Sequence, residues 1–314
     1  MTDTLPPAIF LMGPTASGKT ELAVELVQHF PFEIISVDSA LVYRGLDIGT
    51  AKPGPELLGV AQHHLIDIRD PSDPYSAAEF RQDALAAMAD ITARGRVPLL
   101  VGGTFLYFRA LQYGLSDMPA ADPDVRARLV AEEREHGLDH LYQRLQRIDP
   151  TTAARLHVND PQRIQRALEV YEVTGTPISE WHAQGRGETL PFRLLKLALI
   201  PADRELLHRR IEQRLHQMLD NGFEDEVRAL AERGDLHPEL PALRAVGYRQ
   251  MWACLAGELD QNEVAEKILV ATRQYARRQL TWLRGETDTE CFDSTDPASR
   301  AALVARVGDW LEPG

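Results

Sequence analysis

The sequence predicts an α/β protein with a doubly wound parallel sheet as its core, an all-helical insertion domain and a helical C-terminal part. Three observations carry this prediction. A glycine-rich loop separates an apolar run from a helical pattern near the N-terminus, apolar runs then alternate with helical patterns, and the middle of the chain lacks strand patterns. Alternating strands and helices form parallel sheets that are covered on both faces. We expect residues 1–115 and 191–314 to form the core and residues 116–190 to form the insertion.

Apolar runs define the strands of the first third. Residues 8–12, 32–37 and 97–101 have the length and composition of buried strands, and residues 63–68 are a candidate for a further one. Residues 76–94 have the pattern of an amphipathic helix, which Gly95 ends.

The pattern changes after residue 115. Residues 117–124 are typical of a linker, and residues 125–183 show only helical patterns, with helix starts at Asp149-Pro150 and Asp160-Pro161. Strand character returns at residues 192–200, and residues 203–283 are again mostly helical. A helical insertion within an α/β core explains this order better than two consecutive domains.

Composition indicates a globular protein and excludes several functional classes. The formal net charge of −13 over 314 residues argues against indiscriminate coating of nucleic acid, although it permits a local basic surface. No apolar run reaches membrane-spanning length, and the first four residues lack the basic start of a secretion signal. Cys254 and Cys291 have no metal-type or disulfide spacing. We expect a protein of the reducing cytoplasm with no membrane partner.

The most informative motif is Gly13-Pro14-Thr15-Ala16-Ser17-Gly18-Lys19-Thr20, which lies between a predicted strand and a predicted helix. This is the order that a P-loop requires. The glycines let backbone N–H groups turn toward phosphate oxygens, and the helix adds the positive end of its dipole. Lys19 supplies a mobile charge, and the Thr20 hydroxyl can hold Mg²⁺. The motif predicts a P-loop-type core that binds a di- or triphosphate.

An acid follows the second predicted strand. Asp38 opens the run Asp38-Ser39-Ala40-Leu41-Val42-Tyr43, at the sheet edge that faces the phosphate loop in a doubly wound fold. A carboxylate there could take a proton from an incoming nucleophile. It could equally cap a helix that follows. Position alone does not separate the two interpretations.

No acid follows the strand at residues 97–101. Nucleotide-hydrolysing P-loop proteins usually hold Mg²⁺ with an Asp at that point, whereas this chain continues with Gly102-Gly103-Thr104. The glycines would allow close approach of the backbone to a ligand, and Thr104 could donate its hydroxyl. A tight structural turn is the alternative.

Two arginines mark the helix predicted after Asp203. Arg210 and Arg214 lie one turn apart, at the edge of the apolar stripe of this helix. Guanidinium groups there could neutralise a departing pyrophosphate. The alternative is solvated charges or ion pairs with Glu205 or Glu212.

A basic stretch appears late in this acidic chain. Residues 267–285 hold five basic residues and no acid. On a helix, Arg273, Arg277 and Arg284 share one face, opposite an apolar stripe that includes Tyr275. Such a face suits an RNA backbone, and Trp282 could stack on it or pack beneath it. A solvated helix face is the alternative.

Seven segments together, in their order and spacing, resemble the bacterial tRNA dimethylallyltransferases, also called isopentenyl-tRNA transferases. The resemblance covers essentially the whole chain. The segments are residues 13–20, residues 38–43, His63-His64-Leu65-Ile66-Asp67, Gly102-Gly103-Thr104, residues 163–166, Leu243-Arg244-Ala245-Val246-Gly247-Tyr248 and Arg277-Arg278-Gln279-Leu280-Thr281-Trp282-Leu283-Arg284.

The resemblance implies transfer of a dimethylallyl group from its pyrophosphate to the exocyclic amine of the adenosine 3′-adjacent to a tRNA anticodon. Pyrophosphate leaves, and Mg²⁺ assists. The implied partners are dimethylallyl pyrophosphate and the tRNA anticodon stem-loop, which the insertion clasps, and we expect a monomer.

The resemblance also assigns roles to residues of this sequence. It implies that Asp38 is the general base, that Lys19, Thr20 and Thr104 complete the catalytic set, and that Thr20 is the metal ligand. The implied pyrophosphate-binding residues are Gly13, Pro14, Thr15, Ala16, Ser17, Gly18, Lys19, Thr20 and Arg214. The expected tRNA contacts are Asp38, Ser39, Ala40, Leu41, Thr104, Arg126, Gln162, Arg163, Ile164, Gln165, Arg166, Leu243, Arg244, Ala245, Val246, Gly247, Tyr248, Arg273, Arg277, Arg278 and Arg284.

Two alternative functions stay open at this point. A small-molecule kinase using ATP would also place an Asp after the second strand, but it leaves the arginine face and the insertion without a role. A nucleotide-gated RNA-binding protein without covalent chemistry would make Asp38 and residues 102–104 structural.

Overall fold

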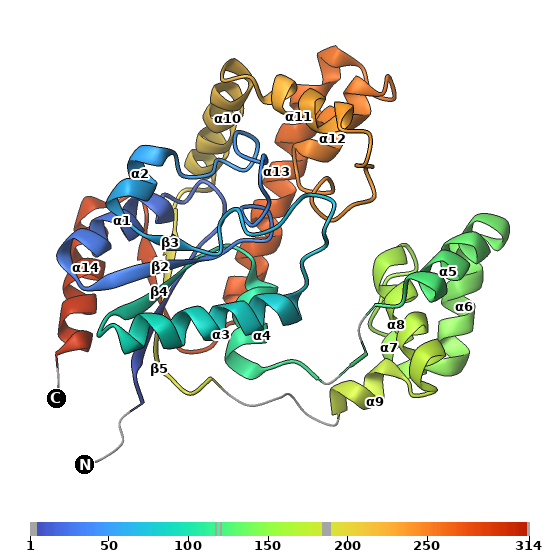
Figure 1. Cartoon of the computed structure of the whole chain (residues 1–314), viewed down its shortest axis with the longest axis horizontal. Coiled ribbons are helices and arrows are strands. Elements are labelled where there is room, and N and C mark those ends of the chain that lie inside the picture. Colours follow the sequence, from blue (N-terminus) through green and yellow to red (C-terminus); the bar gives the residue numbers. More distant parts are fainter. Residues whose placement is uncertain (1–4, 117, 120, 184–189, 313–314) are drawn as a thin grey trace. The chain divides into compact units, whose positions relative to one another are not determined.

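A six-stranded parallel sheet forms the centre of the larger of two units in this computed structural model (Figure 1). The structure describes residues 5–116, 118–119, 121–183 and 190–312. The larger unit comprises residues 1–111 and 191–314, and residues 112–190 form a second unit, which we call the helical unit. The strand order is β3-β2-β4-β1-β5-β6, and every neighbouring pair is parallel. The strands are β1 (Pro7–Met12), β2 (Phe32–Val37), β3 (His63–His64), β4 (Val97–Gly102), β5 (Arg193–Ile200) and β6 (Thr289–Asp293).

Hydrophobic side chains attach helices to both faces of this sheet. On one face, Leu22 of α1 and Leu303 of α14 share a core with Ile9 of β1. On the other face, Phe10 of β1 meets Phe108 of α4, with ring centroids 4.9 Å apart. Successive side chains of a strand point to opposite faces, so a strand buried on both sides is apolar throughout. The helices are α1 (Lys19–His29), α2 (Pro55–Val60), α3 (Ala77–Ala93), α4 (Phe105–Tyr113), α10 (Arg204–Asp220), α11 (Phe223–Glu232), α12 (Tyr248–Leu255), α13 (Gln261–Arg284) and α14 (Pro297–Leu311).

The register of the three central strands brings their carboxyl ends to one level. Met12 of β1 pairs with Gly102 of β4, and Gly102 in turn pairs with Val37 of β2. The residues that follow this row are Gly13, Gly103 and Asp38. The sheet therefore delivers the phosphate loop, the glycine pair and the acid to the same edge.

The helical unit contains α5 (Pro123–His136), α6 (Leu138–Ile148), α7 (Pro150–Ala153), α8 (Pro161–Thr174) and α9 (Ile178–Ala183), and its described residues include no strand. Asp122, Asp149 and Asp160 begin three of these helices, each accepting hydrogen bonds from backbone N–H groups of the first turn. A proline follows each of them at the first helical position. Leu129 and Leu168 are fully buried in the unit's own core.

Most predicted elements of the fold are confirmed. The parallel sheet with surrounding helices is present, the strands predicted at residues 8–12, 32–37, 97–101 and 192–200 correspond to β1, β2, β4 and β5, and both Asp-Pro helix starts are observed. The strand predicted at residues 63–68 is wrong over most of its length. Leu65 and Asp67 have φ angles of 64° and 57°, so only His63–His64 stays extended. The short strand β6 and helix α14 were not predicted.

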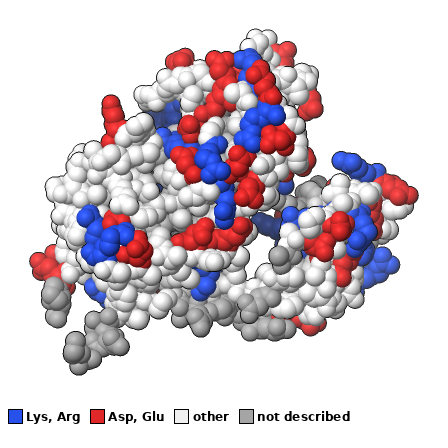
Figure 2. All heavy atoms as spheres, in the orientation of Figure 1, with Lys and Arg blue, Asp and Glu red and all other residues white. Residues whose placement is uncertain are grey.

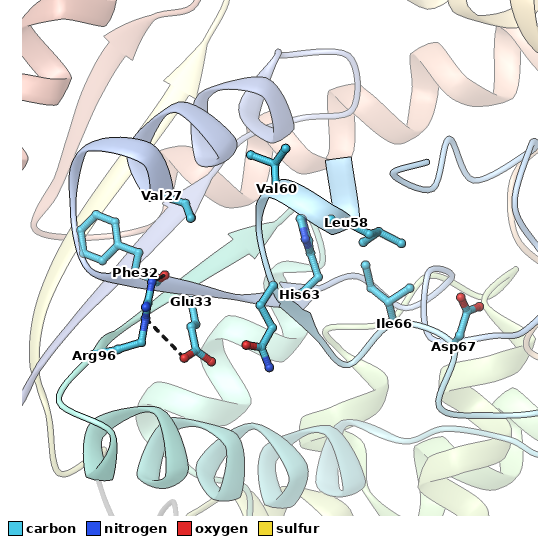
Figure 3. Close-up of a pocket in the computed structure, with 11 residues that line it drawn as sticks. Val27, Phe32, Glu33, Leu58, Val60, His63, Ile66, Asp67 and Arg96 are labelled. Atoms are coloured by element: carbon cyan, nitrogen blue, oxygen red, sulfur yellow. Dashed lines mark hydrogen bonds and ion pairs between the residues drawn. The ribbon is translucent and has the colours of Figure 1, made fainter. Parts of the chain in front are cut away.

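A buried carboxylate organises the outer edge of the sheet. Glu33 of β2 is 4% exposed and lies beside a cavity of about 500 Å³ (Figure 3). His64 Nε2 and Arg94 Nη2 lie 2.8 and 2.6 Å from its Oε2, and Arg96 Nε lies 3.4 Å from its Oε1. Burial raises the pKa of this carboxyl, but hydrogen bonds to Arg94 and His64 outweigh that effect and hold the pKa below its usual value. The cluster ties β2 to β3 and to the segment before β4.

Replacing Glu33 by Ala should lower the free energy of unfolding by about 1–3 kcal/mol at pH 7, because its partners lose a buried acceptor. Since the folded carboxyl has a lowered pKa, its contribution is present at neutral pH and is lost as pH falls from 4.5 through the folded pKa. Urea unfolding of wild type and Glu33→Ala at pH 7 and in acid measures both effects, and the gap should narrow in acid. Glu266→Ala, at an exposed position of α13, is the control. An equal gap at both pH values would contradict the assignment.

Candidate active site

The loop between β1 and α1 has the backbone of a phosphate cradle. Gly18 and Ala16 have φ angles of 85° and 60°, left-handed conformations that turn neighbouring N–H groups toward one side. A Cβ on Gly13 would lie 2.6 Å from the Leu199 carbonyl oxygen, so β5 leaves room only for glycine. The buried Ser17 hydroxyl has no hydrogen-bond partner among the described residues, as expected of a group that awaits a ligand. Helix α1 begins directly after the loop and adds the positive end of its dipole.

Gln279 of α13 holds this loop in place, and sequence analysis missed it. The side chain is 4% exposed. Its Oε1 accepts a hydrogen bond from Thr15 N at 2.8 Å, and its Nε2 donates to the Gly103 carbonyl oxygen at 2.9 Å. A signal was present, because an amide at helical spacing among the buried positions Ala276 and Leu283 predicts a polar partner inside.

Lys19 lies in the field of the other charged groups of the site. Its Nζ donates to the Pro14 carbonyl oxygen at 3.1 Å. Burial lowers the pKa of Lys19 to about 8; the Asp38 carboxylate opposes this shift and the Arg214 cation adds to it. Lys19 of the phosphate loop, Asp38 and Arg214 are thus close enough for their charges to act on one another, in agreement with their predicted place at one site.

Arg214 contacts the loop directly, whereas Arg210 contacts Ser294. Arg214 Nη1 donates to Thr15 Oγ1 at 3.5 Å, and burial lowers the pKa of its guanidinium, opposed by the Glu21 and Asp38 carboxylates. Arg210 Nη1 donates to Ser294 Oγ at 3.4 Å. Both arginines line a cavity of about 370 Å³ that also includes Ser17 and Gly18.

The alternative ion pairs for these arginines do not form among the described residues. Glu205 pairs with Arg209, at 3.9 Å, and Glu212 pairs with Arg273, at 3.4 Å. The Arg214 guanidinium is thus available for an anion bound in the loop.

Asp38 combines both interpretations of its position. Its Oδ1 accepts hydrogen bonds from Ala40 N at 2.8 Å and from Leu41 N at 3.3 Å, as a capping acid does. Its Oδ2 receives no hydrogen bond from the described part of the chain, so one carboxylate oxygen stays available. Ser39 N donates to Thr104 Oγ1 at 3.1 Å, which ties the two loops together.

Tyr275 completes this side of the site and was assigned by sequence only to a core-facing stripe. Burial and the charge of Asp38 raise the pKa of its phenol above the usual value, while Thr104 and Gln279 interact with its hydroxyl. The phenol therefore stays protonated beside the carboxylate.

The glycine pair serves packing, which corrects the expectation that it admits a ligand. A Cβ on Gly102 would lie 2.0 Å from the Val37 carbonyl oxygen of β2. A Cβ on Gly103 would lie 2.2 Å from Gln279 Nε2 and 3.0 Å from the Gly13 carbonyl oxygen. The space beside both residues is filled by protein, and Thr104 is the member of the motif that faces the site.

Helix α13 exposes only part of its predicted basic face. Arg277, Arg278 and Arg284 are exposed. Arg273 is only partly open: it pairs with Glu212 of α10 and its Nε is buried, while its side chain is 35% exposed. Trp282 is 38% exposed, and the Arg109 guanidinium lies 5.3 Å from its ring centroid.

The segment Leu243–Tyr248 is largely structural, a second correction. Leu243 and Tyr248 are fully buried, and Gly247 has a φ of 96°. The Tyr248 hydroxyl donates to Glu226, at 2.5 Å, and the same carboxylate accepts hydrogen bonds from the backbone N–H groups of residues 47–49. Arg244 is exposed, and Ala245 and Val246 are partly exposed. Acidic and basic side chains intermingle on the face that Figure 2 shows around α11 and α12.

In the helical unit, most predicted RNA contacts have partners within the unit. Arg126 and Arg166 both pair with the buried Glu169, at 2.9 and 2.8 Å. Gln165 donates to Glu133 at 2.6 Å. Ile164 is a third correction, because it is fully buried in the core of the unit. Gln162 and Arg163 are exposed.

Within the described ranges, no group of three His, Cys, Asp or Glu side chains is placed to hold a metal ion. A Mg²⁺ ion at the loop would therefore take its ligands from Thr20 and from substrate phosphates, the arrangement that Mg²⁺ commonly uses. The unsatisfied Ser17 hydroxyl and the loop geometry fit a phosphate group that carries such an ion. None of the helices in the described part is long and apolar enough to cross a membrane.

Comparisons with known proteins extend these observations. A model of the family described as IPP transferase matches residues 41–286. A tRNA dimethylallyltransferase of Thioalkalivibrio sulfidiphilus is 62% identical over 309 residues, covering 98% of this chain and 96% of its own.

Solved structures agree. The full-length tRNA isopentenylpyrophosphate transferase of Bacillus halodurans has a TM-score of 0.71 and 36% identity, with 96% of each chain covered. A eukaryotic dimethylallyltransferase acting on tRNA has a TM-score of 0.76 and 28% identity, with 98% of this chain and 80% of that chain covered. The resemblance drawn from the motifs is confirmed, and the chain belongs to the IPP transferase family.

Proposed function

We propose that this protein transfers a dimethylallyl group from dimethylallyl pyrophosphate to the exocyclic amine of the adenosine 3′-adjacent to the anticodon of tRNA, with release of pyrophosphate. The observation that carries the proposal is the placement of the phosphate loop and Asp38 at one edge of the sheet, with Arg214 in contact with the loop, in a member of the IPP transferase family. A relative that is 62% identical to this chain is named tRNA dimethylallyltransferase.

The phosphate loop binds the donor through its pyrophosphate. Backbone N–H groups of Gly18, Lys19 and Thr20 face the phosphate oxygens, and the Lys19 and Arg214 side chains supply two positive charges. Allylic C–O cleavage moves negative charge onto the pyrophosphate, so cations fixed in a partly dehydrated loop stabilise the transition state more than the ground state. Mg²⁺ held by Thr20 and the phosphates would add further neutralisation of the leaving group.

Asp38 accepts the proton that the amine loses as the new C–N bond forms. The adenine amine is a weak nucleophile, and a general base typically contributes about 10²–10⁴ in rate to such a step. The hydrogen bonds from Ala40 and Leu41 fix Oδ1, which leaves Oδ2 for the proton. Thr104 and the protonated Tyr275 lie beside the Asp38 carboxylate and can position the adenine ring.

The target adenosine must leave its stack to reach this site. Ser39, Ala40 and Leu41 follow the catalytic acid and line its approach. Exposed guanidinium groups of α13, with Gln162 and Arg163 of the helical unit, contact the RNA. We also propose that the helical unit serves as the tRNA-clasping domain and that the protein acts as a cytoplasmic monomer.

The direct test incubates the protein with labelled dimethylallyl pyrophosphate and unmodified tRNA, with labelled ATP as a control donor. We expect label from the first donor in the nucleoside next to the anticodon and none from the second. Transfer of phosphate from ATP to a small molecule would instead identify a kinase, and tRNA binding without transfer would identify a binding protein.

The pKa of Lys19 predicts the pH dependence of donor binding. In the protein without donor, the Lys19 ammonium has a pKa of about 8, and only its charged form attracts pyrophosphate. The affinity for dimethylallyl pyrophosphate should therefore be steady below pH 8 and fall by up to about tenfold per pH unit above it. Titration calorimetry with dimethylallyl pyrophosphate measures this. Lys19→Ala should bind the donor weakly at every pH, while its tRNA affinity stays within about threefold of wild type. A flat wild-type profile would refute the assignment.

Asp38→Asn should lower single-turnover prenyl transfer by about two to four orders of magnitude, because it keeps Oδ1 for the loop hydrogen bonds but removes the basic oxygen. Donor affinity should change little. Rapid quench with saturating donor and tRNA separates chemistry from binding. Loss of tRNA affinity with unchanged chemistry would make Asp38 a positioning residue.

Arg277→Ala/Arg284→Ala should weaken binding to all substrate tRNAs alike and leave donor binding unchanged. Each lost phosphate contact should reduce the slope of log affinity against log salt by about 0.7–0.9. Fluorescence anisotropy over a salt series measures the slope, with Arg204→Ala, at an exposed position of α10, as the control. If the double variant keeps the wild-type slope, Arg277 and Arg284 do not contact RNA phosphates.

A further inference from the structure

The helical unit has a cavity of its own, separate from the phosphate loop. Its volume is about 550 Å³, within the range of about 300–1,000 Å³ that is typical of small-ligand sites. Every residue that lines it belongs to the helical unit. We call it the insertion pocket. Its walls come from α5, α7, α8, α9 and the segment between α7 and α8.

The chemistry of the insertion pocket suits a nucleotide. Leu156, Ala167 and Ile178, at the margin of the unit's core, give it an apolar side. Gln162 and His182, both exposed, supply an amide and a flat ring at its rim. Unstacked RNA bases are commonly held by stacking on flat side chains and by hydrogen bonds to amides.

The charge of the insertion pocket suits a phosphate. Four guanidinium groups line it, those of Arg126, Arg155, Arg163 and Arg166, and Asp160 is its one acid. Asp160 pairs with Arg163 at 3.4 Å, and Arg163 remains 70% exposed. Arg155 is exposed and has no ion-pair partner in the described part of the chain.

Glu169 pre-organises two of these arginines. Its side chain is 1% exposed and accepts hydrogen bonds from Asp122 N, from Arg126 and from Arg166, at 2.8, 2.9 and 2.8 Å. Arg166 also donates to the Pro119 carbonyl oxygen, at 2.7 Å. Guanidinium planes that are already fixed lose little conformational entropy when a ligand binds. With Glu169 and Asp160 counted against four arginines, two positive charges remain for an anion.

We propose that the insertion pocket binds one unstacked nucleotide of the RNA substrate, other than the adenosine that is prenylated. Its base contacts the Gln162 amide and the His182 ring beside the apolar Leu156 and Ile178. Its phosphate lies on Arg155 and Arg163. The target adenosine is a different nucleotide, because its amine must reach Asp38, which is not among the residues that line this pocket. The inference rests on the proposed function, in that it takes tRNA as the substrate.

The test measures binding of an anticodon stem-loop by the full-length protein, with an abasic site placed at each loop position in turn. Arg155→Ala/Gln162→Ala changes two exposed side chains of the pocket, so the fold should be preserved. Arg147→Ala, at an exposed position of α6 outside the pocket, is the matched control. Loss of one base stack should weaken wild-type binding by about 5- to 150-fold.

At one loop position other than the target adenosine, removal of the base should weaken RNA binding strongly for wild type and for Arg147→Ala. The same abasic RNA should bind Arg155→Ala/Gln162→Ala almost as well as the intact RNA does. An equal change at all positions would indicate only long-range attraction and would overturn the proposal. Binding of the variant indistinguishable from wild type would also overturn it. Free adenosine, guanosine, cytidine and uridine monophosphates are tested as competitors of RNA binding. If one of them binds the pocket saturably without displacing RNA, the pocket is a site for a free nucleotide and the proposal is overturned.

Prenyl transfer is measured in the same samples. If wild type transfers the dimethylallyl group but shows no position-specific coupling to the pocket, only the pocket inference fails. If wild type transfers none, the proposed function itself fails.

Discussion

The hydrogen-bonded register of β1, β4 and β2 sets the level at which the reactive groups leave the sheet. Gly102 pairs with both Met12 and Val37, so a slip of one residue in either ladder would displace the phosphate loop or Asp38 by about 3.3 Å and reverse the faces of a whole strand. Both faces of the central strands are buried, which opposes such a slip. The separation between the phosphate loop and Asp38 is therefore determined by packing in the core of the sheet.

Helix α13 connects the phosphate loop to an exposed basic face. Its buried side places Gln279 between Thr15 and Gly103, and its exposed side carries Arg277 and Arg284. The amide is satisfied as donor and acceptor in one arrangement only, and leaving either partner unpaired would cost about 1–3 kcal/mol. The helix that carries the exposed Arg277 and Arg284 is thus fixed to the phosphate loop.

Local patterns were sufficient for most of the fold and for the chemistry of single motifs. The apolar runs predicted four strands, and the phosphate loop was evident from its glycines and Lys19. Contacts between distant segments were not predictable: Gln279 meets residues 264 and 176 positions away, and Arg273 meets Glu212 from another helix. Ile164 was grouped with its charged neighbours, although a lone apolar residue at helical spacing belongs to a core. The strand at residues 63–68 failed because two left-handed backbone angles are invisible in its composition.

The lack of space for a side chain at Gly102 limits which residues can replace it. Phosphate-loop hydrolases commonly carry an acid at the end of the corresponding strand. Glycine and aspartate are one nucleotide apart in the genetic code, so mutation would offer that acid readily. In this protein its Cβ would lie 2.0 Å from the Val37 carbonyl oxygen, and the substitution could be accommodated only after β2 had moved. An acid at position 102 would therefore require a rearrangement of the backbone as well as a single nucleotide change.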